Sequence, residues 1–462
     1  LMDRPKKNSS GGHSHCILKL LSARFYSISL RVSRIMLNLN FSVARGPAAP
    51  TPERIALVTG SYEANVDGVA LTLNRLMSHA LRSGHEVLVL SPALGRRRRL
   101  IVPAGDVQHV PSISLPVWSE YRLTWGLGRT ARAALDAFAP TVVHIAVPDM
   151  MGHSAQRWAR RRNVPVLCSH HTRWNVYLNY YRLLPTAPLE RLMWWGMRRF
   201  HRGCDITLPP SEAVAAELRE RAGVQRLAIW PRGVDTTLFN PDRRSSEWRL
   251  AALNSSEATA SSESSTNAET IEKVIVLLVS RLRWEKGLEA FASTVHEAQA
   301  MLDSRAAAAP HPRTRVELSV VVVGGGPARA AFSKLLPSGT VFLGMLTGEA
   351  LATAYASADL FLNPSSTEGW GATCLEAQAS GVPVLATRSS GITDVVAHGV
   401  GGLLVPPANV SALAKAVVEL AADADLRERV GRDAVSHAAR FSWKQSGDLV
   451  LRQYKALTRT PR

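Results

Sequence analysis

The chain has 462 residues, 46% of them apolar, which is enough for two domains that each bury a core of their own. Its formal net charge of +18 first suggests nucleic acid or an anionic membrane as a partner. No run approaches the roughly 18 apolar residues of a membrane-spanning helix, and the four cysteines lack metal-ligand spacing, so an integral membrane protein and a disulfide scaffold are excluded.

Residues 1–52 are predicted to be a basic leader. The first 50 residues carry eight lysines and arginines against a single acid, Asp3, and they are rich in serine. A basic, serine-rich and acid-poor segment is typical of an organelle transit peptide, and the apolar centre of a secretory signal is missing. We therefore expect a protein that is organellar or cytoplasmic and not secreted. The alternative is a disordered tail without a targeting role.

Residues 53–240 predict a first α/β domain. Short apolar runs of strand type alternate with amphipathic helical segments, and strand, helix and strand at this spacing form a parallel βαβ unit. The predicted strands are 54–59, 85–90, 141–145 and 164–169, and the predicted helices are 69–81 and 152–162.

Residues 241–440 repeat the same alternation and predict a second α/β domain. Its expected strands are 274–279, 316–323, 360–362 and 382–386, with a helix over 288–302. Residues 441–462, with a predicted helix over 443–457, follow the second domain. Segment 254–270 consists almost wholly of Ser, Ala, Thr, Glu and Asn, and such a composition predicts a disordered insertion. Two doubly wound sheets place a ligand at the carboxyl ends of their strands.

The segment from Asn363 to Val384 carries the strongest functional signal. Glu368 and Glu376 lie eight positions apart, and a Gly-Trp-Gly turn ending at Gly371 separates them from each other. A helix that begins at Ala372 directs its free N–H groups and its positive dipole end at this turn, which is an arrangement that binds phosphate. Phosphate, ribose and a second polyol could be held side by side, as in a nucleotide-sugar. The alternative is an ordinary capped unit with two solvated glutamates.

Arg281 and Lys286 follow the strand at 274–279 on a strand-to-helix turn. Two cations five residues apart can flank a diphosphate and neutralise the charge that builds on it when a sugar leaves. Basic residues at a helix start are otherwise often solvated. This pair is the second element of the predicted donor site.

Three further loops supply weaker candidates. Gly68 follows the first strand, where the missing Cβ lets the backbone approach a ligand. His170 and His171 end the strand at 164–169, a position at which α/β sites collect side chains, although a single histidine is more often structural. Leu346 lies in a loop that precedes a helix of the second domain.

Two motifs are interpreted as non-functional. Asp423 and Asp425 match a metal-binding Asp-x-Asp pattern, but they join two helical runs, which favours a helix N-cap. The glycine run at 324–326 lacks the third glycine of a dinucleotide fingerprint and continues into Pro327. We therefore predict no metal and no NAD.

Basic clusters occur in the first domain together with aromatic residues. This combination suits an anionic lipid surface, whereas a solvated helix face is the alternative; nucleic acid is disfavoured because no recognised binding module is present. The clusters are Arg96–Arg99, Arg157 with Arg160–Arg162, and Arg198, Arg199 and Arg202, and the aromatics include Trp158, Trp194 and Trp195.

The Glu368-x₇-Glu376 segment resembles the signature of retaining glycosyltransferases of family four, which have the GT-B fold of two Rossmann-like domains facing across a cleft. The resemblance extends from about Arg54 to the C-terminus. It implies that Glu376 holds the ribose, that Glu368 contacts the donor sugar, and that the amides near Gly371 and Ala372 hold the diphosphate. The chain departs from the pattern at Ser280, where glycine is usual, and at Asp67, where asparagine is usual.

The same resemblance assigns the remaining candidates. Arg281 and Lys286 map onto the phosphate clamp, Gly68 onto a loop that approaches the donor, and Leu346 onto a loop that holds the base through backbone groups. His171 matches a histidine near the reacting sugar, and His170 makes a slip of one residue an alternative. The implied catalytic residues are Glu368, His171, Arg281 and Lys286. The helix at 443–457 is expected to return to the first domain.

The implied activity is retaining, metal-independent transfer of a hexose from a UDP- or GDP-sugar to a membrane glycerolipid or glycan, with no cofactor. Two branches look nearest, the plastid sulfoquinovosyltransferases and the bacterial GDP-mannose-dependent α-mannosyltransferases, and the first agrees with a plastid leader. The alternatives are a non-catalytic sugar-nucleotide-binding relative and a GT-B phosphorylase. The base, the sugar, the acceptor and the oligomeric state are left open.

Overall fold

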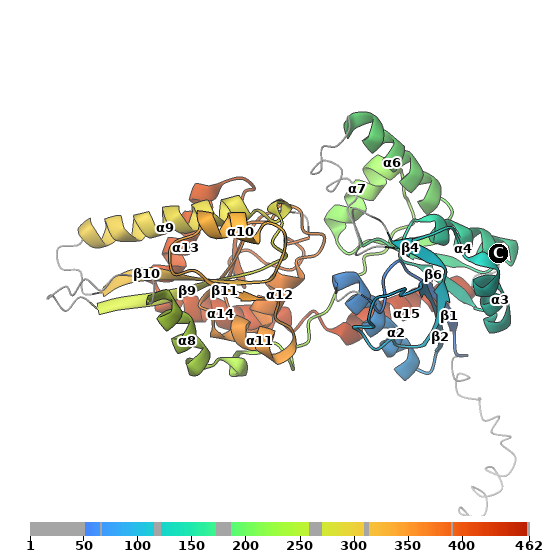
Figure 1. Ribbon diagram of the computed structural model, residues 1–462, viewed down its shortest axis with the longest axis horizontal. Coiled ribbons are helices and arrows are strands. Elements are labelled where there is room, and N and C mark those ends of the chain that lie inside the picture. The colour runs from blue at the N-terminus through green and yellow to red at the C-terminus, as the bar shows by residue number, and fades with distance from the viewer. Residues whose placement is uncertain are drawn as a thin grey trace, which may run out of the picture. The chain divides into compact units, whose positions relative to one another are not determined.

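The structure is a computed structural model that describes residues 51–64, 67–114, 122–171, 186–257, 270–308, 314–389 and 391–459. The leader up to residue 50 and residues 258–269 of the predicted insertion lie outside the described residues. Two six-stranded parallel sheets dominate the described part, each flanked by helices (Figure 1).

The first sheet has the strand order β3-β2-β1-β6-β7-β8, and all of its pairs are parallel. In the central strand, Ile55 and Leu57 enter one core cluster while Ala56 and Val58 enter another. Both faces are buried, which is why the sequence shows a continuous apolar run instead of an alternation. The strands are β1 (Arg54–Val58), β2 (Glu86–Pro92), β3 (Asp106–Val110), β6 (Val142–Ile145), β7 (Val166–Ser169) and β8 (Ile206–Leu208).

Helices cover both faces of this sheet. The C-terminal helix α15 packs beside α2, and its Val450 and Tyr454 join the cluster that contains Leu57. The first domain is therefore built from two separate stretches of the chain. The remaining elements are a hairpin of β4 (Ser112–Ser114) and β5 (Arg122–Thr124) and a set of helices. The helices are α2 (Gly68–Arg82), α3 (Gly128–Phe138), α4 (Met150–Arg161), α6 (Thr186–His201), α7 (Glu212–Ala222) and α15 (Trp443–Arg459).

The second sheet has the order β11-β10-β9-β12-β13-β14, again entirely parallel. In β9, Val274 and Val276 face one core cluster, and Ile275 and Leu277 face the other. The strands are β9 (Thr270–Val279), β10 (Thr314–Val323), β11 (Val341–Gly344), β12 (Leu360–Asn363), β13 (Val384–Thr387) and β14 (Gly402–Val405).

The helices of the second domain lie on two sides of this sheet, with α9 and α13 on one side and α8 and α11 on the other (Figure 1). The α-helices are α8 (Ser246–Glu257), α9 (Leu288–Ala308), α10 (Arg329–Phe332), α11 (Gly348–Ser357), α12 (Ala372–Ala379), α13 (Val410–Ala422) and α14 (Ala424–Ala438). The 3-10 helices are η1 (Pro241–Arg243), η2 (Trp284–Lys286) and η3 (Ser333–Leu335).

The boundaries predicted for the insertion at 254–270 are wrong. Helix α8 continues to Glu257, and β9 already begins at Thr270, which pairs with Thr314. The helix starts where the Ser245 hydroxyl accepts a hydrogen bond from Trp248 N at 3.1 Å, and backbone hydrogen bonding carries it into the polar segment. A polar composition cannot show where this ordered structure ends.

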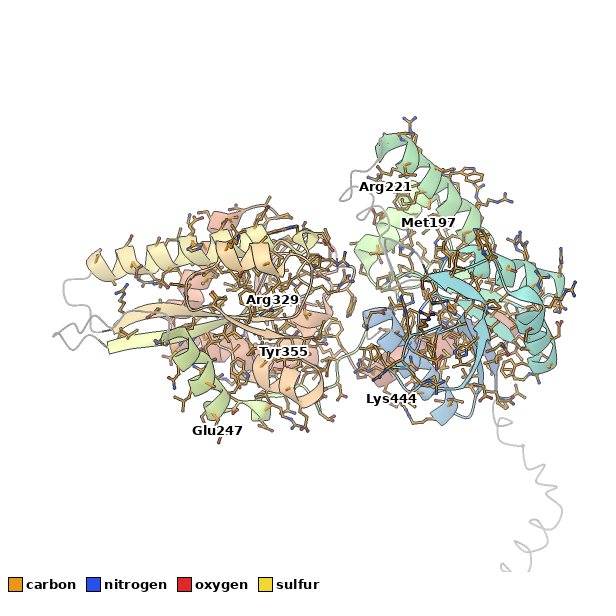
Figure 2. The ribbon with its side chains drawn as sticks, in the orientation of Figure 1. Met197, Arg221, Glu247, Arg329, Tyr355 and Lys444 are labelled. Carbon is orange, nitrogen blue, oxygen red and sulfur yellow. The ribbon has the colours of Figure 1, made fainter. Side chains whose placement is uncertain are left out.

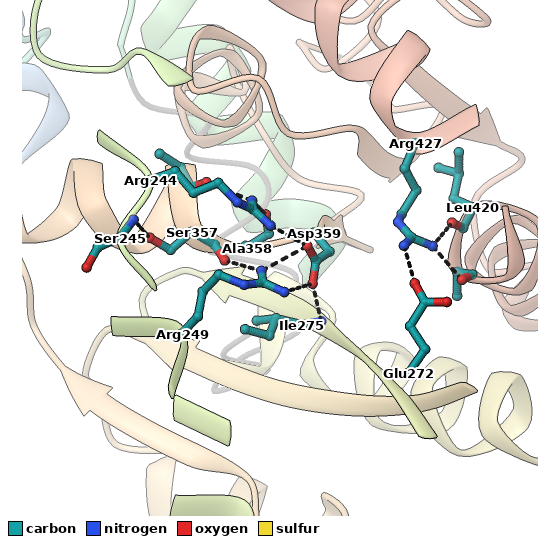
Figure 3. A network of polar contacts seen from close by, with 12 residues as sticks. Arg244, Ser245, Arg249, Glu272, Ile275, Ser357, Ala358, Asp359, Leu420 and Arg427 are labelled. Atoms are coloured by element: carbon teal, nitrogen blue, oxygen red, sulfur yellow. Dashed lines mark hydrogen bonds and ion pairs between the residues drawn. The ribbon is translucent and has the colours of Figure 1, made fainter. Parts of the chain in front are cut away.

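Asp359, immediately before β12, connects three parts of the second domain (Figure 3). Its carboxylate accepts hydrogen bonds from Arg244 at 2.9 Å, from Arg249 at 2.9 Å and from the backbone N–H of Ile275 at 2.8 Å. A second ion pair, between Arg427 of α14 and Glu272 of β9, lies in the same view. These pairs fix α8 and the neighbouring strands around the central strand β9.

Candidate functional site

Helix α12 begins as the sequence predicts, at Ala372. Its N-cap is Gly371, with φ +80°, and no side chain caps the helix. A Cβ at Gly371 would lie 3.1 Å from Val395 Cγ2, so the left-handed conformation and the close packing both favour glycine. The first N–H groups of the helix are thus not used by a side-chain cap, and the phosphate site stays a prediction.

Glu368 and Lys286 meet directly. Lys286 Nζ donates to Glu368 Oε1 at 2.8 Å, and the two side chains are only 14% and 20% exposed. Burial raises the pKa of Glu368, but the positive charge and hydrogen bond of Lys286, together with the charge of Arg281, outweigh burial and leave the pKa below its usual value. The carboxylate is therefore ionised at neutral pH and holds the lysine in place.

Polar contacts join the loops that carry this pair. Thr367 Oγ1 donates to the backbone oxygen of Glu285 at 3.0 Å, and Thr387 Oγ1 donates to that of Ser365 at 2.7 Å. A Cβ at Gly287, where φ is +75°, would lie 2.9 Å from Pro364 O. The Glu-Lys-Gly turn and the Glu368 loop therefore form one packed unit.

Glu376 has a partner that the sequence analysis missed. The fully buried Tyr355 of α11, marked in Figure 2, donates its hydroxyl to Glu376 Oε2 at 3.0 Å. Burial raises the pKa of Glu376 to about 7, although the Tyr355 hydrogen bond opposes this shift. The tyrosine fixes one carboxylate oxygen, which leaves the other to accept a hydrogen bond from a ligand.

Gly324 and Gly326 of the glycine run at 324–326 pack closely against residues 280–282, the turn that carries Arg281. A Cβ at Gly324 would lie 1.9 Å from Ser280 O, and one at Gly326 would lie 2.3 Å from Leu282 O. Both glycines have positive φ, whereas Ser280 does not. Serine at position 280 therefore costs no backbone strain, and the departure from the family pattern leaves the turn that carries Arg281 intact.

The first domain places its candidates at the carboxyl ends of β1 and β7. Asp67 is the N-cap of α2, and its carboxylate accepts hydrogen bonds from the N–H groups of Val69 and Ala70 at 2.9 and 2.8 Å. A Cβ at Gly68 would meet no atom within 4 Å, so the helix start is open to an approaching group. Aspartate caps a helix as well as asparagine does, which accounts for the departure at position 67.

His171 is part of a chain of hydrogen bonds. Arg232 Nη2 lies 2.9 Å from His171 Nδ1, and His171 Nε2 lies 2.7 Å from Ser169 Oγ. The chain continues over 2.7 Å from Ser169 Oγ to His144 Nε2, and over 2.6 Å from His144 Nδ1 to the Tyr454 hydroxyl.

The arginine determines the direction of this chain. A guanidinium can only donate, so His171 Nδ1 accepts and His171 Nε2 carries the proton. Ser169 then receives that proton in a hydrogen bond and donates its own to His144 Nε2. Both ring nitrogens of His171 are engaged within the protein, which distinguishes it from a free acid or base.

The other predicted positions have mixed outcomes. The Leu346 side chain packs against a core cluster, so only its backbone is suited to contact a base. Asp423 caps α14 by accepting from Leu426 N at 2.8 Å, as predicted. Trp158 is 5% exposed and donates to Asp136, so its assignment to an interfacial aromatic cluster is wrong. Trp195, in contrast, is 60% exposed.

Comparisons with known proteins agree with this geometry. Residues 66–238 match the family model described as Glycosyltransferase Family 4, and residues 273–423 match Glycosyl transferases group 1. A GDP-mannose-dependent alpha-mannosyltransferase of Mycolicibacterium smegmatis is 32% identical over 87% of this chain and 97% of the relative. The chain belongs to glycosyltransferase family 4. It is therefore a glycosyltransferase, and the predicted enzyme class is confirmed.

Other relatives and solved structures extend the comparison. Sulfoquinovosyl transferase SQD2 of Arabidopsis thaliana is 29% identical over 85% of this chain and 71% of the relative. The sucrose-phosphate synthase structure from Thermosynechococcus elongatus has a TM-score of 0.67 and 19% identity, and it covers 88% of this chain and 99% of that chain. The structure of the glycosyltransferase WaaG has a TM-score of 0.56 and 16% identity, and it covers 88% of this chain and 100% of that chain. The predicted GT-B fold class is confirmed.

Two properties concern the described residues as a whole. None of the helices within the described ranges is long and apolar enough to cross a bilayer. Within the same ranges, no three His, Cys, Asp or Glu residues are grouped so that they could hold a metal ion.

Proposed function

We propose that this glycosyltransferase moves a hexose from a nucleoside-diphosphate sugar to an acceptor hydroxyl with retention of configuration. The observation that carries the proposal is the Lys286–Glu368 pair at 2.8 Å, in which Glu368 stands four residues before Ala372, the uncapped start of α12. The second glutamate, Glu376, lies one turn into the same helix. The name of one relative, GDP-mannose-dependent alpha-mannosyltransferase, supports a GDP-sugar as donor, and a UDP-sugar is the alternative donor of the proposal.

In the proposed reaction, the bond between the sugar C1 and the diphosphate oxygen breaks while a bond from the acceptor oxygen to C1 forms on the same face. The acceptor proton passes to a leaving phosphate oxygen, so no protein nucleophile is required. Arg281, Lys286 and the N–H groups at Gly371 and Ala372 stabilise the negative charge that builds on the diphosphate. These groups take the place of a metal ion, and Glu376 accepts from the ribose hydroxyls.

Calorimetric titration with UDP, GDP and ADP tests the donor class. One nucleoside diphosphate should bind at least tenfold more tightly than the other two. A transfer assay with the sugars of that nucleotide should give a product whose anomeric configuration, determined by NMR, matches the donor. The proposal fails if none of the three nucleotides binds, and an inverted product would contradict retention alone.

Metal independence has its own test. Turnover should remain within about twofold after EDTA treatment, because the protein's cations and amides neutralise the diphosphate. A complete loss that Mg²⁺ or Mn²⁺ restores would contradict this part of the proposal while leaving the donor class unaffected.

The proposed acceptor is a membrane glycerolipid or a glycan, and an anionic membrane is the proposed surface. Arg157, Arg160 and Arg161 are exposed on α4, and α6 exposes Leu192 and Trp195 at 60% each. Arginines attract anionic headgroups, and an exposed tryptophan suits the interfacial region. In the loop after β2, Arg96 and Arg98 are exposed, whereas Arg99 pairs with the buried Glu63 at 2.7 Å.

Liposome sedimentation tests this surface. Binding to anionic vesicles should fall with salt, and serine at Arg157, Arg160 and Arg161 should weaken it without a change in nucleotide affinity. Serine at Arg243, Arg315 and Arg432 removes the same charge from the second domain and is the matched control. Equal losses of vesicle binding in both triple variants would mean that binding depends only on the net charge of the protein. Efficient transfer to a soluble sugar without vesicle binding would contradict a lipid acceptor.

The proposed location is a plastid, with the protein peripheral at a membrane. The basic leader and the plant relative support it. Residues 1–52 fused to a fluorescent protein should direct it to plastids, and a diffuse cytosolic signal would contradict the targeting role.

A further inference from the structure

Arg232 is a buried cation of the first domain. It is 8% exposed, and its guanidinium carbon lies 4.1 Å from the centre of the Trp230 ring. Its Nη2 donates to His171 Nδ1 at 2.9 Å, and its Nη1 donates over a long 3.4 Å to Trp230 O. These contacts use two of the five N–H groups of the guanidinium and none of them supplies a negative charge.

No carboxylate of the described residues forms an ion pair with Arg232, and burial alone accounts for the lowering of its pKa to about 9. The sequence next to His171, residues 172–185, contains two arginines and no aspartate or glutamate. The second domain shows the usual alternative, because its partly buried Arg249 and Arg427 each pair with a carboxylate.

The histidines around Arg232 are kept neutral. Burial, followed by the charge of Arg232, lowers the pKa of His144 to about 3. Burial, Arg232, His144 and His170 together hold the pKa of His171 well below its usual value. The cluster therefore carries one buried positive charge and no negative one. Such a charge costs several kcal/mol unless an anion joins it.

We propose that Arg232, together with the partly exposed His171, forms a subsite for a tetrahedral oxyanion, a phosphate or a sulfonate, that one of the substrates carries. A guanidinium presents paired N–H groups that match two oxygens of such a group. Trp230 holds its plane, and the hydrogen-bond chain from Tyr454 to His171 fixes the ring beside it. The substrate source rests on the function proposed above, whereas the anion site itself does not.

Binding of inorganic sulfate tests the site without turnover. Histidine ring nitrogens labelled with ¹⁵N are followed by NMR, with the His171 and His144 signals assigned from H171Q and H144Q. The measurement uses K286A protein, so that sulfate at the diphosphate clamp does not contribute, and sodium chloride at equal ionic strength is the reference. Sulfate should shift the His171 signal saturably.

Two substitutions compare a cation without a carboxylate partner and one with such a partner. Adding Arg232→Met should weaken sulfate binding at least tenfold, and adding Arg249→Met should leave it unchanged. Arg232→Lys keeps the charge without the paired donors and should give an intermediate affinity. The proposal is overturned if sulfate causes no saturable shift at His171, or if the shift in Arg232→Met or Arg232→Lys equals that of the K286A parent.

The source of the anion follows from paired substrates. Donors with and without a sulfonate on the sugar form one pair, and acceptors with and without a phosphate form the other. Arg232→Met should raise KM at least tenfold for the anionic member of one pair only, and that pair identifies the source. Unchanged KM values in both pairs overturn the substrate assignment. If sulfate binds but no sugar transfer occurs, the proposed function fails and the anion site stands.

Discussion

Lys286 of the second domain and Arg232 of the first are both largely buried, but they differ in whether a carboxylate pairs with them. In the second domain, Lys286 is paired with Glu368 and Asp359 with two arginines, whereas Arg232 of the first domain has no carboxylate partner among the described residues. A paired cation must exchange its partner for a ligand, so it can bind and release an anion at modest cost. An unpaired buried cation makes the protein less stable until an anion arrives. A buried cation with a carboxylate partner therefore stabilises the ligand-free protein, whereas one without such a partner is stabilised only when an anion binds.

The largest expected effect is at Lys286. Lys286→Ala should lower turnover about 10²–10³-fold if Lys286 has its proposed role of stabilising the leaving diphosphate. It should also weaken nucleoside-diphosphate binding about tenfold or more, as a charged hydrogen bond contributes ~1.5–3 kcal/mol. Steady-state kinetics and calorimetry measure both. Lys334→Ala removes an exposed lysine of the same domain and should change neither. Unaltered nucleotide affinity in Lys286→Ala would remove Lys286 from the site.

The next effect concerns the stability of the second domain, in which Asp359 pairs with two arginines. Asp359→Ala leaves Arg244 and Arg249 without their carboxylate and Ile275 N without an acceptor, and it should cost about 3 kcal/mol of unfolding free energy. Hydrogen exchange at the Ile275 amide provides a local measurement. Asp303→Ala, at a partly exposed ion pair with Arg315, should cost no more than about 1 kcal/mol. Similar losses of unfolding free energy in Asp359→Ala and Asp303→Ala would mean that burial of the Asp359 ion pairs does not increase their contribution to stability.

A third effect is the pH dependence of donor binding. The pKa of Glu376 is raised to about 7, so lowering the pH from 8 to 6 protonates the carboxylate that should accept from ribose. Nucleoside-diphosphate affinity should fall up to about tenfold over this range. The Glu376→Gln variant should bind weakly at both pH values. The ligand-free protein responds in the opposite sense, because a raised carboxyl pKa favours folding at low pH and loses that contribution as pH passes 7.

The smallest expected effect is on the stability of the first domain, and it compares Arg232, which has no carboxylate partner among the described residues, with Arg249, which has one. Arg232→Met should leave the unfolding free energy unchanged or raise it, because the loss of the hydrogen bond to His171 and of the long one to Trp230 O is offset by the loss of an uncompensated buried charge. Arg249→Met should cost more, about 2 kcal/mol, because it leaves part of Asp359 unpaired. Denaturant unfolding in sulfate-free buffer measures both variants. If the Arg232 variant loses as much as the Arg249 variant, Arg232 is compensated within the folded protein.

The fold was largely predictable because its strands are buried on both faces. Val274–Val279 appears in the sequence as a continuous apolar run, and β9 indeed contributes to two cores. Helix α12 was predicted to begin at Ala372, where it does begin, since the Gly371 turn marks its start. The three-residue strand β8 was not predicted, because so short a strand has too few residues for a pattern. The longer helices α6 and α7 were not predicted either.

The candidate site was predictable only where its residues are close in sequence. The Glu368–Glu376 spacing and the Arg281–Lys286 turn are local signals. The contact of Tyr355 with Glu376 and the chain from Tyr454 to His144 join residues 21 and 310 positions apart. Such contacts depend on the tertiary fold, and a single tyrosine on an apolar helix face predicts only a core residue. Arg232 likewise has no local pattern that would mark it as buried.

The return of α15 to the first domain has a consequence for synthesis on the ribosome. Most domains acquire their core as they emerge, the N-terminal one first. Here Val450 and Tyr454 complete the cluster around Leu57, and they emerge only after the whole of the second sheet. The second domain therefore has all its strands before the first has its last helix. Until translation reaches α15, helix α2 covers this face of the first sheet, but the part that Val450 and Tyr454 cover remains open to chaperones.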